Sequence, residues 1–223
     1  MEIHERFLVS LGGGGGPMTR LPFGTGFPGV DDAFGGICPG EVTVFAGAPG
    51  SGKTAALVHV AAHINVPVML FAQPGAAARF RDGEWNAVVK IEESGLGSLK
   101  AIERLALEAR NVHGIGAVFI DDFHLLEGVR PSWSFSQRRG MNRFRRFVRK
   151  SGLAVLVSWG VEARPGLGAN WADLRGTIVE EPDLLMLAQE TNAAPRASRI
   201  ATFHPMPRDH RDTFVYDRLS FVA

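Results

Sequence analysis

Residues 47–54 combine glycine, lysine and threonine in a spacing that suits phosphate binding. They match the pattern G-x-x-x-x-G-K-[ST] in full. In that pattern backbone N–H groups turn inward around phosphates, Lys53 reaches the β- and γ-phosphates, and the Thr54 hydroxyl ligates Mg²⁺. We therefore predict a nucleoside triphosphate site, for ATP with Mg²⁺, formed by Gly47, Ala48, Pro49, Gly50, Ser51, Gly52, Lys53 and Thr54.

A glycine-rich turn of purely structural origin is the alternative explanation of this loop. The surrounding residues argue against it, because an apolar β-rich stretch at 41–45 runs into the loop and a helical pattern at 54–64 follows. The loop thus has the context that phosphate binding requires. A helix that begins near Gly52 aims its positive dipole end at the bound phosphates.

A Mg²⁺ ion held by Thr54 needs a second protein ligand. Such a ligand is normally an aspartate at the carboxyl end of a neighbouring apolar strand. The buried-strand pattern at 116–120 ends in Asp121 and Asp122. We assign the metal role to Asp121, with Asp122 as the adjacent alternative.

The elements that must position these residues alternate between strands and helices. Helices are predicted at 54–64, from an N-cap at Ser98, and at 139–150. The pattern predicts an α/β fold with a mostly parallel sheet covered by helices on both faces, and the short connections late in the chain predict an antiparallel edge near the C-terminus. The predicted strands are 41–45, 66–71, 88–91, 116–120, 153–159, 184–187, 200–203 and 214–216.

The composition excludes several classes of protein. The chain has 223 residues, a net charge of +1 and a single cysteine, so neither a disulfide framework nor a cysteine-rich zinc site fits. The seven histidines show no metal-ligand spacing. No apolar run is long enough to span a membrane. We expect a cytoplasmic protein, with residues 1–21 as a flexible tail containing the glycine linker 12–16, and residues 22–223 as the ATPase domain. A partner-binding peptide, or an engineered linker before a natural start at Met18, is the alternative for the tail.

An ordered set of motifs lies at 25–41, around the phosphate loop, and at 113–126, 158–159 and 171–183. Together these motifs resemble the RecA-type core of the DnaB family of replicative helicases. The Asp-Leu-Arg block, residues 173–175, is the most specific part of the resemblance. The resemblance implies a RecA-like P-loop NTPase that forms a hexameric ring, holds ATP between neighbours and passes single-stranded DNA through its channel in replication or repair. A replication protein would be a further partner.

Three positions depart from that family. The family carries a catalytic glutamate after the strand that follows the phosphate-loop helix, where this chain has Gln73. A glutamine orients water but does not accept its proton. A sensor-like glutamine corresponds to His124, and a Lys-x-Arg finger pair corresponds to residues 204–206, which carry neither charge. Arg208 or Arg211 is a possible replacement. The candidate catalytic residues are Lys53, Thr54, Gln73, Asp121 and His124.

A basic segment offers a surface for nucleic acid. Residues 130–150 contain eight basic side chains and no acidic one. Basic and aromatic residues in a loop suit backbone phosphates and stacked bases, whereas residues 143–150 fit the solvated face of an amphipathic helix. The predicted DNA contacts are Arg130, Trp133, Arg138 and Arg139 in this segment, and Arg164 in a second loop at 163–171.

Two functions of different class therefore stay open. One is an ATP-driven motor on single-stranded DNA. The other is a nucleotide-dependent oligomeric scaffold or helicase accessory protein with little or no hydrolysis, which the missing glutamate and finger residues favour. A third possibility is a signalling or recombination ATPase on the same fold, and its only support is that this fold hosts many functions.

Overall fold

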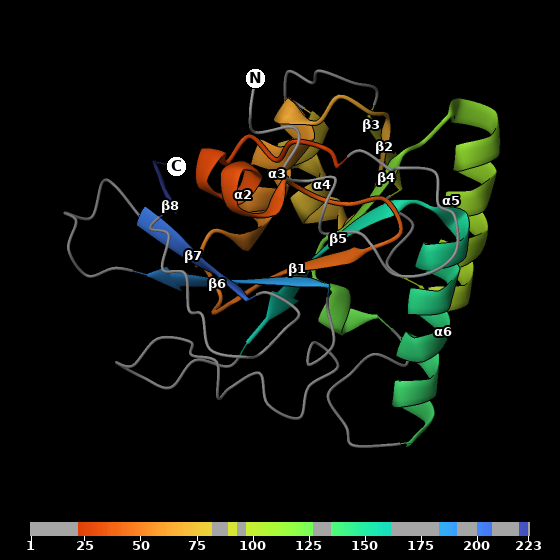
Figure 1. Cartoon of the computed structure of the whole chain (residues 1–223). Helices are drawn as coiled ribbons and strands as arrows, with labels where there is room; N and C mark the ends of the chain where they lie inside the picture. Colours follow the sequence, from red (N-terminus) through yellow and green to blue (C-terminus); the bar gives the residue numbers. More distant parts are fainter. Residues whose placement is uncertain are drawn as a thin grey trace, which may run out of the picture.

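A computed structural model of the chain has helices packed on a central sheet (Figure 1). The structure describes residues 22–81, 89–92, 97–126, 135–161, 183–190, 200–206 and 219–222. The predicted tail, 1–21, lies outside these residues. In this described part no helix is long and apolar enough to cross a membrane.

Within the described residues the sheet has eight strands, in the order β3-β2-β4-β5-β1-β6-β7-β8. All pairings from β3 to β6 are parallel, whereas β6 with β7 and β7 with β8 are antiparallel. The predicted parallel sheet with an antiparallel C-terminal edge is thus confirmed. The bounds are β1 (Val42–Gly47), β2 (Val68–Phe71), β3 (Val89–Glu92), β4 (Ala117–Ile120), β5 (Ala154–Gly160), β6 (Leu184–Glu190), β7 (Ile200–Met206) and β8 (Leu219–Val222).

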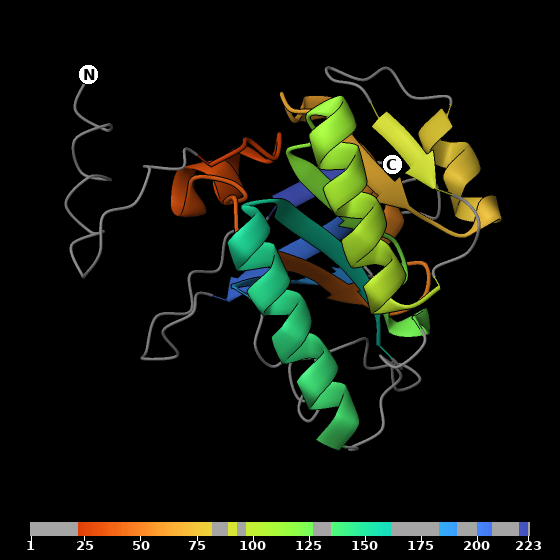
Figure 2. The same cartoon turned by 90° about the vertical axis from the view of Figure 1, so that its right-hand side faces the viewer.

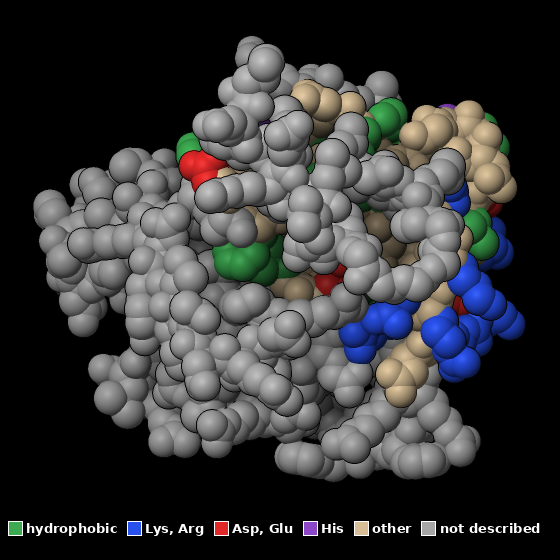
Figure 3. All heavy atoms as spheres, in the orientation of Figure 1, with side chains coloured by type: hydrophobic (Ala, Val, Ile, Leu, Met, Phe, Trp, Pro, Cys, Tyr) green, Lys and Arg blue, Asp and Glu red, His purple; other side chains and the backbone are tan. Residues whose placement is uncertain are grey.

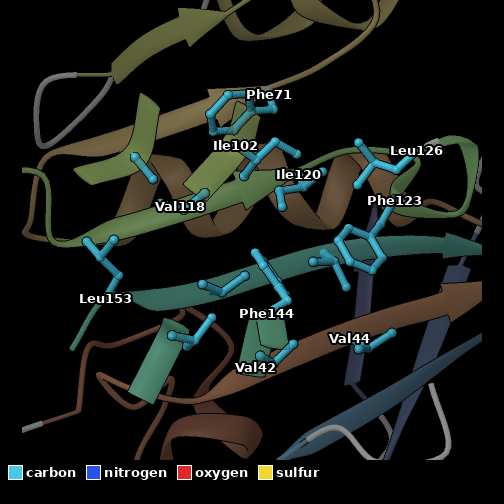
Figure 4. Packing of buried hydrophobic residues seen from close by; sticks show 14 of the residues in the cluster. Val42, Val44, Phe71, Ile102, Val118, Ile120, Phe123, Leu126, Phe144 and Leu153 are labelled. Atoms are coloured by element: carbon cyan, nitrogen blue, oxygen red, sulfur yellow. The ribbon is translucent and has the colours of Figure 1, made fainter. Parts of the chain in front are cut away.

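Helices cover both faces of the sheet (Figures 1 and 2). Helices α5 (Leu99–His113) and α6 (Phe135–Ser151) lie on one face, while α2 (Pro28–Phe34), α3 (Lys53–His63) and α4 (Pro74–Arg81) lie on the other. Strand side chains alternate between the faces. Val42 and Val44 therefore join the core under α5 and α6, which Figure 4 shows from close by, whereas Phe45 packs under α3.

Most element predictions are confirmed within a few residues. Ser98 caps α5 as expected, because its side chain accepts a hydrogen bond from the N–H of Ala101. Helices α2 and α4 were missed, although each starts at a proline, a residue that suits the first turn of a helix. The strand predicted at 214–216 lies outside the described residues, and β8 follows it at 219–222.

Candidate nucleotide site

The phosphate loop joins the central strand β1 to helix α3. Gly50 and Gly52 have φ of 79° and 92°, in the left-handed region that favours glycine. The N–H of Ser51 donates to the carbonyl of Ala48 at 3.1 Å, which tightens the turn. Gly52, a fixed position of the motif, and Gly50, one of its variable positions, therefore stand where the backbone favours glycine.

Lys53 folds back over the loop. Its Nζ donates to the carbonyl oxygen of Ala48 at 2.8 Å, and the residue is only 8% exposed. Burial lowers the pKa of Lys53, while the carboxylates of Asp122 and Asp121 oppose that shift. The ammonium group of Lys53 is suited to bind phosphate oxygens at this loop.

Asp121, directly after β4, is hydrogen-bonded to Thr54 in the first turn of α3. The Thr54 hydroxyl lies 3.1 Å from Oδ1 and 3.0 Å from Oδ2 of Asp121, which is 1% exposed. Burial raises the pKa of Asp121, and the hydrogen bond from Ser158 acts against it. Asp122 is half-buried and has no such bond to Thr54 among the contacts of the described residues. The geometry favours Asp121 over Asp122 as the partner of Thr54.

Ser158 links the two aspartates. Its Oγ donates to Oδ1 of Asp121 at 2.6 Å and accepts the N–H of Asp122 at 2.7 Å. The sequence reasoning did not select Ser158 as a site residue. The signal available was a serine near the carboxyl end of β5, the strand that lies between β1 and β4.

The site fits a magnesium nucleotide by the chemistry of its donors. Hydroxyl and carboxylate oxygens are hard ligands that suit Mg²⁺, which usually takes few protein ligands together with water and phosphate oxygens. The Oγ of Ser51 is buried and makes no hydrogen bond in the described part of the chain. No group of three His, Cys, Asp or Glu side chains among those residues could hold a metal by itself. Thr54 and Asp121 would thus need phosphate or water to complete a coordination shell.

His124 lies at the edge of this site, on the short 3₁₀ helix η1 (Phe123–Leu125). Its Nδ1 accepts the N–H of Gly160 at 3.1 Å, and its ring lies 5.9 Å from the ring of Trp159. Burial lowers the pKa of His124, against the carboxylate of Asp122, which raises it. Because Nδ1 accepts, a neutral ring carries its proton on Nε2.

Comparison with known proteins gives a match in structure and none in sequence. No protein-family model matches the sequence, and no curated protein matches it. Among solved structures, the chain is similar to the ATPase domain of G40P, with a TM-score of 0.66, 16% sequence identity, and coverage of 92% of this chain and 89% of that one. The chain has a RecA-like fold.

Gln73 lies beyond β2 in this RecA-like sheet. The carbonyl of Phe71, two residues earlier, accepts the N–H of Asp121 at 2.9 Å, so β2 and β4 end together. Gln73 is half-buried, and its carbonyl accepts the N–H groups of Ala76 and Ala77 as α4 begins. Gln73 therefore lies at the same edge of the sheet as Asp121, but its side chain is an amide and not a carboxylic acid.

The predicted DNA residues are only partly described. Arg130, Trp133 and Arg164 lie outside the described residues. The loop position expected for Arg138 was wrong, because α6 begins at Phe135, four residues before the predicted helix start at 139, and includes both Arg138 and Arg139. Their contact with DNA stays a prediction. Further along α6, four basic side chains are exposed, namely Arg143, Arg146, Arg149 and Lys150. Figure 3 shows lysine and arginine side chains gathered on one side of the molecule.

The finger positions lie at the antiparallel edge of the RecA-like sheet. Residues 204–206 belong to β7, where His204 pairs with Leu187 of β6. Arg208 and Arg211 lie outside the described residues. The proposed replacement of a missing finger by one of these arginines therefore stays a prediction.

Proposed function

We propose that this chain binds ATP with Mg²⁺ at the loop 47–54. The observation that carries the proposal is the Thr54 hydroxyl within 3.1 Å of both carboxylate oxygens of Asp121. These are the two side chains that a magnesium nucleotide requires in P-loop proteins. Lys53 would neutralise phosphate charge, and loop N–H groups with the start of α3 would bind phosphate oxygens. Mg²⁺ would supply charge neutralisation of the triphosphate.

We further propose that the chain is a motor core that acts on single-stranded DNA as a ring of identical subunits, in the cytoplasm. Support comes from the ordered motifs, from the RecA-like fold, and from the basic segment that leads into α6. Positive charge at the start of α6 would bind backbone phosphates. The ring, six subunits and a replication partner are part of this proposal.

A nucleotide-dependent scaffold or helicase accessory protein is the second candidate. A specific observation favours it, since Gln73 stands beyond β2 where the resembling family has its catalytic glutamate. Removal of a proton-accepting group lowers hydrolysis without lowering ATP affinity. The two candidates therefore differ in turnover and agree on binding.

Nucleotide binding is tested first with Lys53→Ala. Loss of the buried ammonium should weaken binding of Mg²⁺-ATP by about a hundredfold or more, because charged hydrogen bonds to phosphate are strong. Equilibrium binding of a fluorescent ATP analogue measures it. Lys100→Ala, an exposed lysine on α5, is the matched control. Equal affinities in Lys53→Ala and the wild type would remove the site assignment.

Motor and scaffold are separated by turnover and mass. ATPase rate with and without single-stranded DNA, together with native mass in Mg²⁺-ATP, reports both at once. A motor should show weak turnover that DNA stimulates, on a ring-sized assembly. A rate near the median of about 10 per second without DNA would contradict a degenerate site. An assembly with no turnover in either condition would favour the scaffold.

The DNA surface is tested by charge reversal. Replacement of Arg138 and Arg139 by Glu should weaken single-stranded DNA binding and flatten its salt dependence, since fewer counterions are released. Replacement of Arg149 and Lys150 by Glu, at the other end of α6, is a control with the same charge change. Equal salt slopes in the two variants would exclude the amino end of α6 from the DNA site.

A further inference from the structure

We propose that Ser158 is a positioning residue for the magnesium site, because its hydroxyl holds the carboxylate of Asp121 in place beside Thr54. The inference rests on the proposed function, since Thr54 and Asp121 are the side chains that would hold Mg²⁺ next to the bound triphosphate. Ser158 lies on β5, the strand between β1 and β4. The role assigned to it is in the affinity for the metal.

The register of the sheet brings Ser158 to the metal side chains. Val157, the residue before it, pairs with Ile120, the last residue of β4, so Ser158 lies level with Asp121. Leu156, two residues before Ser158, belongs to the core under α3. Because side chains on one strand alternate between the two faces, Ser158 also faces α3.

The hydroxyl of Ser158 is buried in the middle of the protein. The residue is 0% exposed, and its neighbours Val157 and Trp159 on β5 are buried as well. A buried hydroxyl is unfavourable unless it is hydrogen-bonded. Ser158 meets this demand with two bonds, because its Oγ lies 2.6 Å from Oδ1 of Asp121 and 2.7 Å from the N–H nitrogen of Asp122.

The direction of these bonds follows from the donors. A main-chain N–H only donates, so Ser158 Oγ accepts from Asp122 and its single proton goes to Oδ1 of Asp121. Thr54 also has one hydroxyl proton to donate, and its oxygen lies 3.1 Å from Oδ1 and 3.0 Å from Oδ2. An ionised carboxylate has about four lone-pair sites, so Asp121 keeps acceptor capacity for a metal.

A carboxylate fixed in this way suits Mg²⁺ in particular. Mg²⁺ demands near-ideal octahedral geometry, so it tolerates little movement of its ligands. Residues that hydrogen-bond a metal ligand typically contribute about ten- to a hundredfold to metal affinity. Loss of the Ser158 hydroxyl should therefore reduce the affinity that Mg²⁺ adds to nucleotide binding.

A structural role at the turn after β4 is the alternative for Ser158. Asp122 has a left-handed φ of 53°, and the bond to Ser158 holds its N–H at this turn. If that were the whole role, loss of Ser158 would weaken nucleotide binding equally with and without a metal. A positioning role acts only when the metal is present.

The test is Ser158→Ala in the full chain, with the affinity for a fluorescent ATP analogue measured in Mg²⁺ and in EDTA. The ratio of the two dissociation constants gives the contribution of the metal. This ratio should fall by about tenfold in the variant, while affinity in EDTA changes less than about threefold.

Ser151→Ala is the matched control and should keep the wild-type ratio. Ser151 is also a buried serine with one bond of each kind, because its Oγ donates to the carbonyl of Val148 and accepts the N–H of Leu153. Ser158→Cys is a second variant for the case in which alanine prevents folding. A thiol fills nearly the same space but forms weak hydrogen bonds, so the ratio should fall here too.

The outcomes separate this inference from the proposed function. A wild-type ratio in Ser158→Ala and Ser158→Cys would overturn the positioning role and leave the nucleotide site standing. Equal losses of affinity in Mg²⁺ and in EDTA would make Ser158 structural. A wild-type chain that binds ATP equally well in both conditions would overturn the inference and the magnesium site together. A chain that binds no ATP would overturn the proposed function itself.

Discussion

The two ends of helix α3 carry polar networks of opposite character. At its amino end the phosphate loop, Lys53 and Thr54 face Asp121. At its carboxyl end His59 and His63 hold the segment that leads into α2. The first network buries charge, and the second satisfies its polar groups with each other. Buried charge at the amino end suits a ligand, whereas polar groups that bond to each other at the carboxyl end hold the chain together. We call the second network the clasp.

The clasp at the carboxyl end of α3 consists of residues 25–27, Asp31, His59 and His63, and its polar groups bond to each other. Asp31 accepts the N–H and the hydroxyl of Thr25 at 2.8 and 2.7 Å, and the N–H of Gly26 at 3.1 Å. His59 Nε2 donates to the Gly26 carbonyl at 2.9 Å, and its ring stacks on Phe27 with centroids 4.2 Å apart. A buried polar group with its partners in place stabilises a fold and leaves nothing for a ligand to add.

The amino end is different, because the hydrogen bonds from Thr54 and Ser158 do not fully offset the burial of the Asp121 charge. Asp121 is a nearly buried carboxylate whose pKa is raised by burial, and the buried Ser51 hydroxyl has no partner among the described residues. A buried charge without full compensation destabilises the protein alone. A cation bound to Asp121 would reverse that effect, so stability and binding are opposed at this end of α3.

The largest expected effect comes from Asp121→Asn. Binding of Mg²⁺-ATP should weaken by about a hundredfold or more, since the neutral amide is a poor Mg²⁺ ligand. The nucleotide-free protein should melt at the same temperature or higher, because the variant no longer buries a charge. Calorimetry with and without Mg²⁺-ATP measures both. A large drop in the melting temperature of the free variant would mean that Asp121 is structural, like Asp31.

Asp31→Ala should have a smaller effect of the opposite kind, on the stability of the protein and not on nucleotide binding. Removal of the acceptor for three donors should reduce the free energy of unfolding by roughly 2 kcal/mol. ATP affinity should change less than about threefold, because the clasp lies at the far end of α3. Urea unfolding measures the first and analogue binding the second. Asp32→Ala, one residue away and exposed, is the control and should stay within about 0.5 kcal/mol.

The sequence predicts the amino end of α3 far better than the carboxyl end. The loop pattern encodes its own geometry, and Asp121 follows from the rule that parallel strands end at one edge. Ser158 escaped selection because its role depends on β5 lying beside β4. The clasp escaped as well, because the contact of Gly26 with His59 joins residues 33 positions apart and the motif at 25–41 does not include His59.

The start of α6 shows a second limit. Residues 130–138 look like a basic, aromatic loop, yet the helix begins at Phe135 and continues through Gly140. Intrinsic propensity is a weak guide when one face of a helix is buried. Phe144 and Val148 are fully buried against the sheet, and Arg145 forms an ion pair with Asp183 at 3.7 Å. These tertiary contacts stabilise a helix longer than local composition indicates.

The smallest expected effect is a pH dependence at the clasp. Burial lowers the pKa of His59 below 6.5; the Gly26 carbonyl and Asp31 oppose this, and the charge of His63 adds to it. Above pH 6.5 the ring is neutral in both states and has no effect. As the pH falls below 6.5, the unfolded chain takes up a proton that the folded chain resists, so the free energy of unfolding decreases toward the lower, folded pKa.

His59→Gln isolates this contribution, because glutamine keeps an N–H donor for the Gly26 carbonyl and does not titrate. Urea unfolding at pH 7.5 and 5.0 should show a smaller loss of stability on acidification in the variant than in the wild type. His113→Gln, an exposed histidine at the end of α5, should leave the loss unchanged. Nucleotide affinity at pH 7.5 should be the same in all three proteins, since the clasp lies at the opposite end of α3 from the loop. If His59→Gln and the wild type lose the same stability on acidification, then titration of His59 does not cause that loss.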